Sequence, residues 1–135
     1  MRSVILGLLI FTVLVSACKK DSEDSPPLSK EEMLCQNWDV ETYIINEHSY
    51  AYMPRLFNWV FKTDGTIEIT ELETGNIKYV STWEWAEEQE ALDIKILQTH
   101  KEDRIARVNI ATLTESKMVF EPGDSEEQLS MKFSR

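Results

Sequence analysis

The chain has 135 residues, of which 42% are hydrophobic and 28% are charged, and its formal net charge is −10. This length suffices for one ordinary domain, and the composition is typical of a globular protein rather than a disordered one. The acidic excess argues against a nucleic-acid partner, because binding a phosphate backbone requires a surplus of Lys and Arg. Two cysteines are too few for a disulfide-rich scaffold.

An apolar segment lies near the start of the chain. It covers residues 4–15, contains no charged side chain and follows Arg2. Its twelve residues would span about 18 Å as a helix, whereas a helix needs roughly 20 residues to cross a bilayer core. The segment is therefore predicted to be the hydrophobic part of a signal peptide over residues 1–17, and not a permanent membrane span.

Two small residues and a cysteine follow the apolar segment. The sequence Val15-Ser16-Ala17-Cys18 resembles the lipobox of bacterial lipoproteins. This resemblance implies cleavage before Cys18, attachment of a diacylglycerol to its sulfur and acylation of the new amino terminus. Several acyl chains would anchor the protein stably to a membrane, since one chain alone holds only marginally. The alternative is an ordinary secretory signal followed by an incidental cysteine.

The lipidated cysteine and a flexible tether are predicted for residues 18–32. Beyond Cys18 this segment contains no aromatic residue and one aliphatic residue, Leu28, so it buries too little apolar surface to offset its ordering entropy. Its acidic start resembles signals with which some Gram-negative lipoproteins reach the surface of the outer membrane. Anchoring in the outer membrane is expected, with the cell-surface and periplasmic faces as equal alternatives.

One all-β domain is predicted for residues 33–135, preceded by a helical turn over 30–36 that a capping box of Ser29 and Glu32 could begin. Short runs rich in β-branched and aromatic residues alternate with polar residues, which is the period-two pattern of strands with one buried face. Turn signals such as Asp64-Gly65 separate them, and short turns force antiparallel neighbours. The segment 47–55 could hold a helical turn or a lid. Eight strands are predicted, over 38–46, 56–63, 66–73, 77–86, 91–99, 104–113, 117–121 and 128–134.

These strands are expected to close into a small eight-stranded antiparallel up-and-down barrel. Each strand presents an apolar face and a polar face, which suits a sheet with a single core. A sandwich is the alternative, but closure removes the exposed edges and a meander closes most simply as a barrel. The first inward positions are Phe57, Trp59 and Phe61, and a later strand contributes Tyr79, Trp83 and Trp85.

The domain resembles the lipocalin-like lipoproteins of Gram-negative envelopes. The resemblance rests on the opening stretch LCQNW at 34–38, the strand and hairpin VFKTDGT at 60–66, the stretch STWEW at 81–85, and the paired runs at 110–113 and 117–120. It implies a lipocalin-like β-barrel and a small apolar or amphipathic ligand.

A hypothetical ligand site follows from the inward aromatic residues. Phe57, Trp59, Phe61, Tyr79, Trp83 and Trp85 could line a cavity, with Tyr50, Tyr52, Met53 and Leu56 at its rim. Such a protein would bind its ligand without catalysis. The alternative is a barrel filled by its own aromatic side chains, which would act through its surface as an accessory subunit or partner of another envelope protein.

No residue pattern predicts enzymatic chemistry, and no cofactor or metal is expected. Cys35 is the one thiol besides Cys18, and it lacks the sequence context of a nucleophile. His48 and His100 do not have ligand spacing. The acidic turns at 87–90 and 124–127 lack the pattern of a calcium loop and are expected to be solvated.

Overall fold

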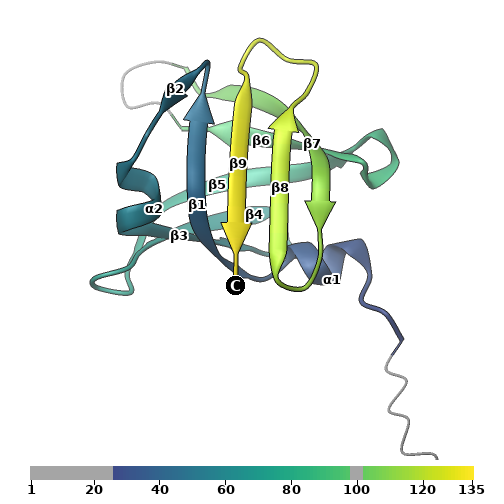
Figure 1. Cartoon of the computed structure of the whole chain (residues 1–135), viewed down its shortest axis with the longest axis horizontal. Coiled ribbons are helices and arrows are strands. Elements are labelled where there is room, and N and C mark those ends of the chain that lie inside the picture. The colour runs from purple at the N-terminus through teal and green to yellow at the C-terminus, as the bar shows by residue number, and fades with distance from the viewer. Residues whose placement is uncertain (1–25, 98–101) are drawn as a thin grey trace, which may run out of the picture.

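The structure is a computed structural model that describes residues 26–97 and 102–135 (Figure 1). The predicted signal peptide, Cys18 and most of the predicted tether lie outside these ranges. Within them, nine antiparallel strands form one sheet that closes through pairing of β1 (Asn37–Ile45) with β9 (Leu129–Ser134). Eight strands make the closed barrel, and β2 (His48–Ser49) adds to the edge of β1. The predicted fold class, a small eight-stranded antiparallel barrel, is confirmed.

The remaining strands follow the chain as a meander, each paired with the next. The strands predicted over 77–86 and 104–113 have the predicted bounds, and most of the others differ by one or two residues at an end. The strand predicted over 91–99 ends at Ile96, and its last two predicted residues lie outside the described ranges. The strands are β3 (Phe57–Phe61), β4 (Thr66–Glu71), β5 (Ile77–Ala86), β6 (Ala91–Ile96), β7 (Arg104–Leu113) and β8 (Lys117–Pro122).

The segment 47–55, predicted to hold a helical turn or a lid, contains two short elements. Strand β2 turns back on β1, and α2 (Tyr52–Leu56) then leads into β3. The turn between β1 and β2 places Asn46 and Glu47 at φ of 49° and 68°, in the left-handed region. Figure 1 shows α2 beside β1 and β3.

Helix α1 (Lys30–Leu34) begins with the predicted capping box. The Glu32 backbone N–H donates to Ser29 Oγ at 3.1 Å, and the Ser29 backbone N–H donates to the Glu32 carboxylate at 2.8 Å. The side chain of Lys30 reaches the connection between β5 and β6, where it donates to the Gln89 carbonyl at 3.2 Å and pairs with Glu90. The folded unit therefore begins at the capped helix, inside the segment predicted as tether, and the helix ends at Leu34 rather than at residue 36.

The end of the barrel beside α1 is filled with side chains. Leu34 is fully buried there, and its carbonyl accepts a hydrogen bond of 2.9 Å from Trp38 Nε1. Phe61, Phe120 and Phe133 pack next to this pair with ring centroids 5.5–6.2 Å apart. The buried core cluster runs from Leu34 to Phe133, and the ring of strands closes between β1 and β9, so the segment 26–135 contains the closed barrel and this core.

Candidate functional site

A cavity of about 920 Å³ lies at the barrel end opposite α1. Its walls come from the last residues of β1 and the first residues of β3 and β9, whereas α1 packs near the first residue of β1 and the last residue of β3. Helix α2 contributes Tyr52, Met53 and Leu56 to the rim. The barrel is therefore divided along its axis into a filled end and a hollow end.

Five of the eight predicted ligand-site residues line this cavity. Phe57 and Trp59 are buried in its wall, at 8% and 3% exposure, while Tyr79 stands at its border with 47% of its surface exposed. Tyr50 and Tyr52 lie at the rim, as do Met53 and Leu56. The structure thus brings these side chains together around one hollow space.

The other three predicted residues do not line the cavity. Phe61 is 1% exposed and packs against Phe133 and Trp83 at the filled end. Trp83 is also buried, and its Nε1 donates to the Lys62 carbonyl at 3.0 Å. Trp85 is half-buried, with its ring 5.4 Å from that of Trp83. These three side chains fill the core and leave the cavity to the residues nearer the other end of their strands.

Sequence reasoning missed Tyr43, which is 8% exposed and lines the cavity. Its ring lies 5.9 Å from Trp59 on one side and 5.9 Å from Tyr50 on the other. The strict alternation of β1 is broken by a register shift between Val40 and Thr42, so the inward positions change parity along the strand. A β-bulge of this kind cannot be read from a period-two pattern.

The buried hydroxyl groups that line the cavity, those of Tyr43 and Ser81, are uncharged at neutral pH. Burial raises the pKa of Tyr43 well above its usual value, and the neighbouring phenols Tyr52 and Tyr50 add to this effect. Ser81 lines the cavity as well, and its hydroxyl donates to the Lys95 carbonyl. Trp59 differs from these groups, because its buried Nε1 has no hydrogen-bond partner among the described residues.

Two ion pairs stand on the cavity wall. Arg104 Nη1 lies 2.6 Å from Glu127 Oε1, and Lys95 Nζ lies 3.0 Å from Asp103 Oδ2. The Glu127 side chain is nearly buried and also accepts a hydrogen bond of 2.8 Å from the Asn46 side-chain amide. Asn46 thereby joins the turn after β1 to the loop between β8 and β9.

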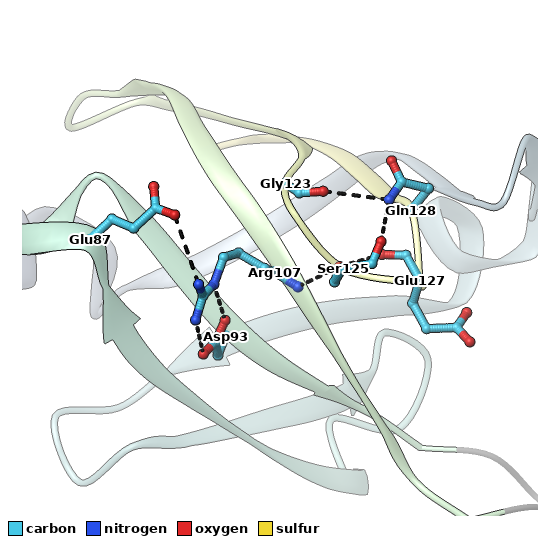
Figure 2. Close-up of polar contacts among 7 residues, drawn as sticks. All are labelled: Glu87, Asp93, Arg107, Gly123, Ser125, Glu127 and Gln128. Atoms are coloured by element: carbon cyan, nitrogen blue, oxygen red, sulfur yellow. Dashed lines mark hydrogen bonds and ion pairs between the residues drawn. The ribbon is translucent and has the colours of Figure 1, made fainter.

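The loop between β8 and β9 is fixed to β7 by hydrogen bonds with the main chain of Arg107 (Figure 2). The Gly123 N–H donates to the Arg107 carbonyl at 2.8 Å, and the Arg107 N–H donates to Ser125 Oγ at 2.9 Å. A Cβ at position 123 would lie 2.7 Å from the Arg107 carbonyl oxygen, so glycine is required for this close approach. Ser125 Oγ in turn donates to the Glu127 carbonyl at 2.8 Å, which holds Glu127 beside the cavity.

The Arg107 side chain makes a separate cluster with acidic residues. Figure 2 shows its guanidinium directed toward Asp93 and Glu87. Two bonds of 2.8 Å join it to Asp93, and Glu87 lies 3.8 Å away. Hydrogen bonding from Arg107 lowers the pKa of Asp93 and raises that of the arginine. This pair links β6 to β7, and neither of its residues is among those that line the cavity.

Reactive groups are sparse in the described part of the chain. Burial raises the pKa of Cys35 to about 11, with contributions from the nearby carboxylates Glu31 and Asp64, so this thiol stays protonated at neutral pH. His48 is exposed, with Nδ1 2.9 Å from the Asn46 carbonyl oxygen, and His100 lies outside the described residues. Over 26–97 and 102–135 there is no group of three or more His, Cys, Asp or Glu residues placed to hold a metal ion. In the same ranges no helix is long and apolar enough to cross a bilayer.

Comparison with known proteins assigns no family. No protein-family model matches the chain, and no curated protein matches it as a relative. What the protein does is therefore inferred from its sequence, its barrel and its cavity.

Proposed function

We propose that the protein is a lipid-anchored, lipocalin-like lipoprotein of the bacterial outer membrane that binds a small apolar or amphipathic molecule without catalysis. The observation that carries this proposal is the cavity of about 920 Å³ in the hollow end of the barrel. Sites for small molecules are commonly concavities of about 300–1,000 Å³ with apolar and aromatic walls. Eight-stranded barrels are wide enough to hold one small ligand when side chains do not fill them.

The lining chemistry supports an apolar body for the ligand. Phe57 and Trp59 form one part of the wall, and Ile94, Ile96 and Leu129 form another. Removing apolar ligand surface from water against such walls contributes about 25 cal/mol per Å². Aromatic walls add edge-to-face or stacked contacts with ring-bearing ligands. The exposed tyrosines at the rim suit a molecule with one polar end.

The position of the open end agrees with an anchor at the other end of the domain. The chain enters the barrel through α1, which packs at the filled end, and the cavity opens at the opposite end. A lipid anchor at Cys18 would therefore belong to the part of the chain that leads into the filled end of the barrel.

Native mass spectrometry of the protein extracted from its host tests this function. We expect one small molecule per chain, and we expect the Ile96→Trp variant to lose it, because Ile96 is inward and the larger ring would occupy the cavity. The matched control is Ile105→Trp, which makes the same change at a position that is 54% exposed on the outer surface. The control should retain the molecule.

An empty mass for the wild-type protein, together with no uptake of an added apolar fluorescent probe, would overturn the proposal. The barrel would then act through its surface, as an accessory subunit or binding partner of another envelope protein. Equal binding by the Ile96→Trp variant and the wild type would show that the ligand occupies another place.

A further inference from the structure

The charged side chains on the cavity wall are balanced within pairs. Arg104 is joined to Glu127 at 2.6 Å, and Lys95 is joined to Asp103 at 3.0 Å. Among the described residues that line the cavity, these four are the only ones with Lys, Arg, Asp or Glu side chains. The described residues of the wall therefore have no net formal charge, and both of these cations already face a carboxylate.

The remaining polar groups of the wall are neutral. They are the hydroxyl groups of four tyrosines, the amide of Asn46, the hydroxyl of Ser81 and the indole N–H of Trp59. Ser81 is bonded to the Lys95 carbonyl, and Asn46 is bonded to Glu127, so both already have protein partners. The tyrosine hydroxyls at the rim can both donate to and accept from a ligand oxygen.

An ionised ligand would bind this wall at a cost. A carboxylate that enters the cavity loses its hydration and must compete with Glu127 or Asp103 for a cation. Moving an ion out of water without giving it a partner is strongly unfavourable. The formal charge of −10 on the whole chain opposes the approach of an anion as well.

We infer that the cavity selects an uncharged amphiphile: a molecule with a flat or cyclic apolar body and a hydroxyl or carbonyl group, and not a carboxylate. This inference rests on the proposed binding function and narrows its ligand class. The aromatic wall of Phe57, Trp59 and Tyr79 receives the apolar body. The rim tyrosines, Tyr50 and Tyr52, lie where the polar end of such a molecule would meet water.

Two probes with one ring system test the inference. Pyrenemethanol is uncharged and pyrenecarboxylate is ionised at neutral pH, and both accept excitation energy from tryptophan. They are titrated into the segment 26–135, which contains the closed barrel and its core. We expect pyrenemethanol to bind at least about tenfold more tightly, which corresponds to about 1.4 kcal/mol.

A charge-neutralising variant provides the second arm. Glu127→Gln removes the carboxylate that faces Arg104, so we expect the affinity for pyrenecarboxylate to rise about fivefold or more while that for pyrenemethanol is unchanged. The matched control is Glu126→Gln, which removes the same charge from an exposed neighbour. Glu127 is nearly buried, so its substitution could disturb the fold. Asp103→Asn is therefore a second variant, which removes the carboxylate that faces Lys95 at a partly exposed site.

The outcomes separate the two proposals. Equal or tighter binding of pyrenecarboxylate by the wild type, with no response to Glu127→Gln or Asp103→Asn, would overturn the selection of uncharged ligands and leave the binding function standing. Failure of both probes to bind the wild type would overturn the inference, and together with an empty native mass it would overturn the binding function as well.

Discussion

Three of the four tryptophans are buried, and their indole N–H groups have different partners. Trp38 Nε1 donates to the Leu34 carbonyl at 2.9 Å and Trp83 Nε1 donates to the Lys62 carbonyl at 3.0 Å. Trp59 Nε1 has no partner among the described residues. A buried donor without a partner gains nothing from folding to offset its lost hydration. Of the three buried tryptophans, Trp59 is thus the one whose indole nitrogen makes no hydrogen bond with the described residues.

This difference predicts unequal costs for the same substitution. Trp59→Phe removes an unpartnered donor, whereas Trp83→Phe removes a donor and leaves the Lys62 carbonyl without that bond. We expect Trp83→Phe to lower the free energy of unfolding by about 1 kcal/mol more than Trp59→Phe. Urea denaturation of the two variants measures the difference. Equal losses would mean that packing alone determines the cost at both positions.

The ion pair of Asp93 and Arg107 predicts a pH-dependent contribution to stability. Because the pKa of Asp93 is lowered in the folded state, the pair stabilises the fold at neutral pH, where the carboxylate is ionised. That contribution should disappear as the pH falls below about 4, where the carboxyl group becomes protonated in the unfolded and then the folded chain. The stability difference between wild type and Asp93→Asn should therefore shrink as the pH is lowered from 7 to 3.

Glu41→Gln is the control for this pH series. Glu41 is exposed on β1 and forms no ion pair within the described residues. Its substitution should change stability little at any pH in the range. A difference for Asp93→Asn that stays constant down to pH 3 would contradict the role given to the pair.

At the scale of elements, the connection between β5 and β6 has an unusual backbone. Glu87, Glu88 and Gln89 have φ values of 49°, 54° and 69°, so three consecutive residues with side chains lie in the left-handed region. Each such residue costs roughly 1–2 kcal/mol relative to right-handed backbone. Lys30 reaches this turn from α1 and donates to the Gln89 carbonyl, which helps to hold the conformation.

Glycine at the centre of this turn should stabilise the protein. Glu88→Gly removes the side chain from a residue at φ 54° and ψ 39°, so we expect the free energy of unfolding to rise by roughly 0.5–1 kcal/mol. The control is Glu84→Gly, at an exposed position within β5. It should lower the free energy of unfolding by roughly 0.5–1 kcal/mol, because glycine weakens a strand. Thermal unfolding of both variants measures the two changes. Destabilisation by both would contradict the strain assigned to the turn.

The elements also show what the sequence could predict. Alternation and turn residues sufficed for the meander and for the bounds of β5 and β7, and the spacing of Ser29 and Glu32 sufficed for the capping box. They did not suffice for the register shift between Val40 and Thr42 in β1, because this bulge depends on pairing with β9 at the other end of the chain. The turn at 87–89 was expected, but its left-handed backbone was missed, since three residues with side chains there give no glycine signal.

The candidate site illustrates the same limit. The period-two pattern of apolar residues assigned Phe57, Trp59 and Phe61 to one face of β3, and all three are buried. It could not say which of them border a cavity, because depth along the barrel axis depends on where α1 fills the interior. Phe61 packs at the filled end, whereas Phe57 lies at the hollow end.

At the scale of the whole molecule, membrane anchoring remains a prediction from the lipobox resemblance. Cells that express the full chain and take up an alkyne-tagged fatty acid should attach the tag to the wild-type protein and not to Cys18→Ser. Cys35→Ser is the matched control, because it makes the same change at the other cysteine, which lies in the barrel domain. It should be labelled like the wild type. Labelling of Cys18→Ser would contradict acylation through Cys18.

The pairing of β1 with β9 determines when the barrel can form. The two strands are joined over residues 39–45 and 129–134, so the ring closes between the first and last strands of the domain. Contacts this distant in the chain form slowly, because a long loop must be ordered before they are made. In a chain exported from its amino terminus, as the predicted signal peptide implies, β1 emerges first and must wait for β9. During that interval its edge is open to wrong partners, so completion of folding is tied to completion of export.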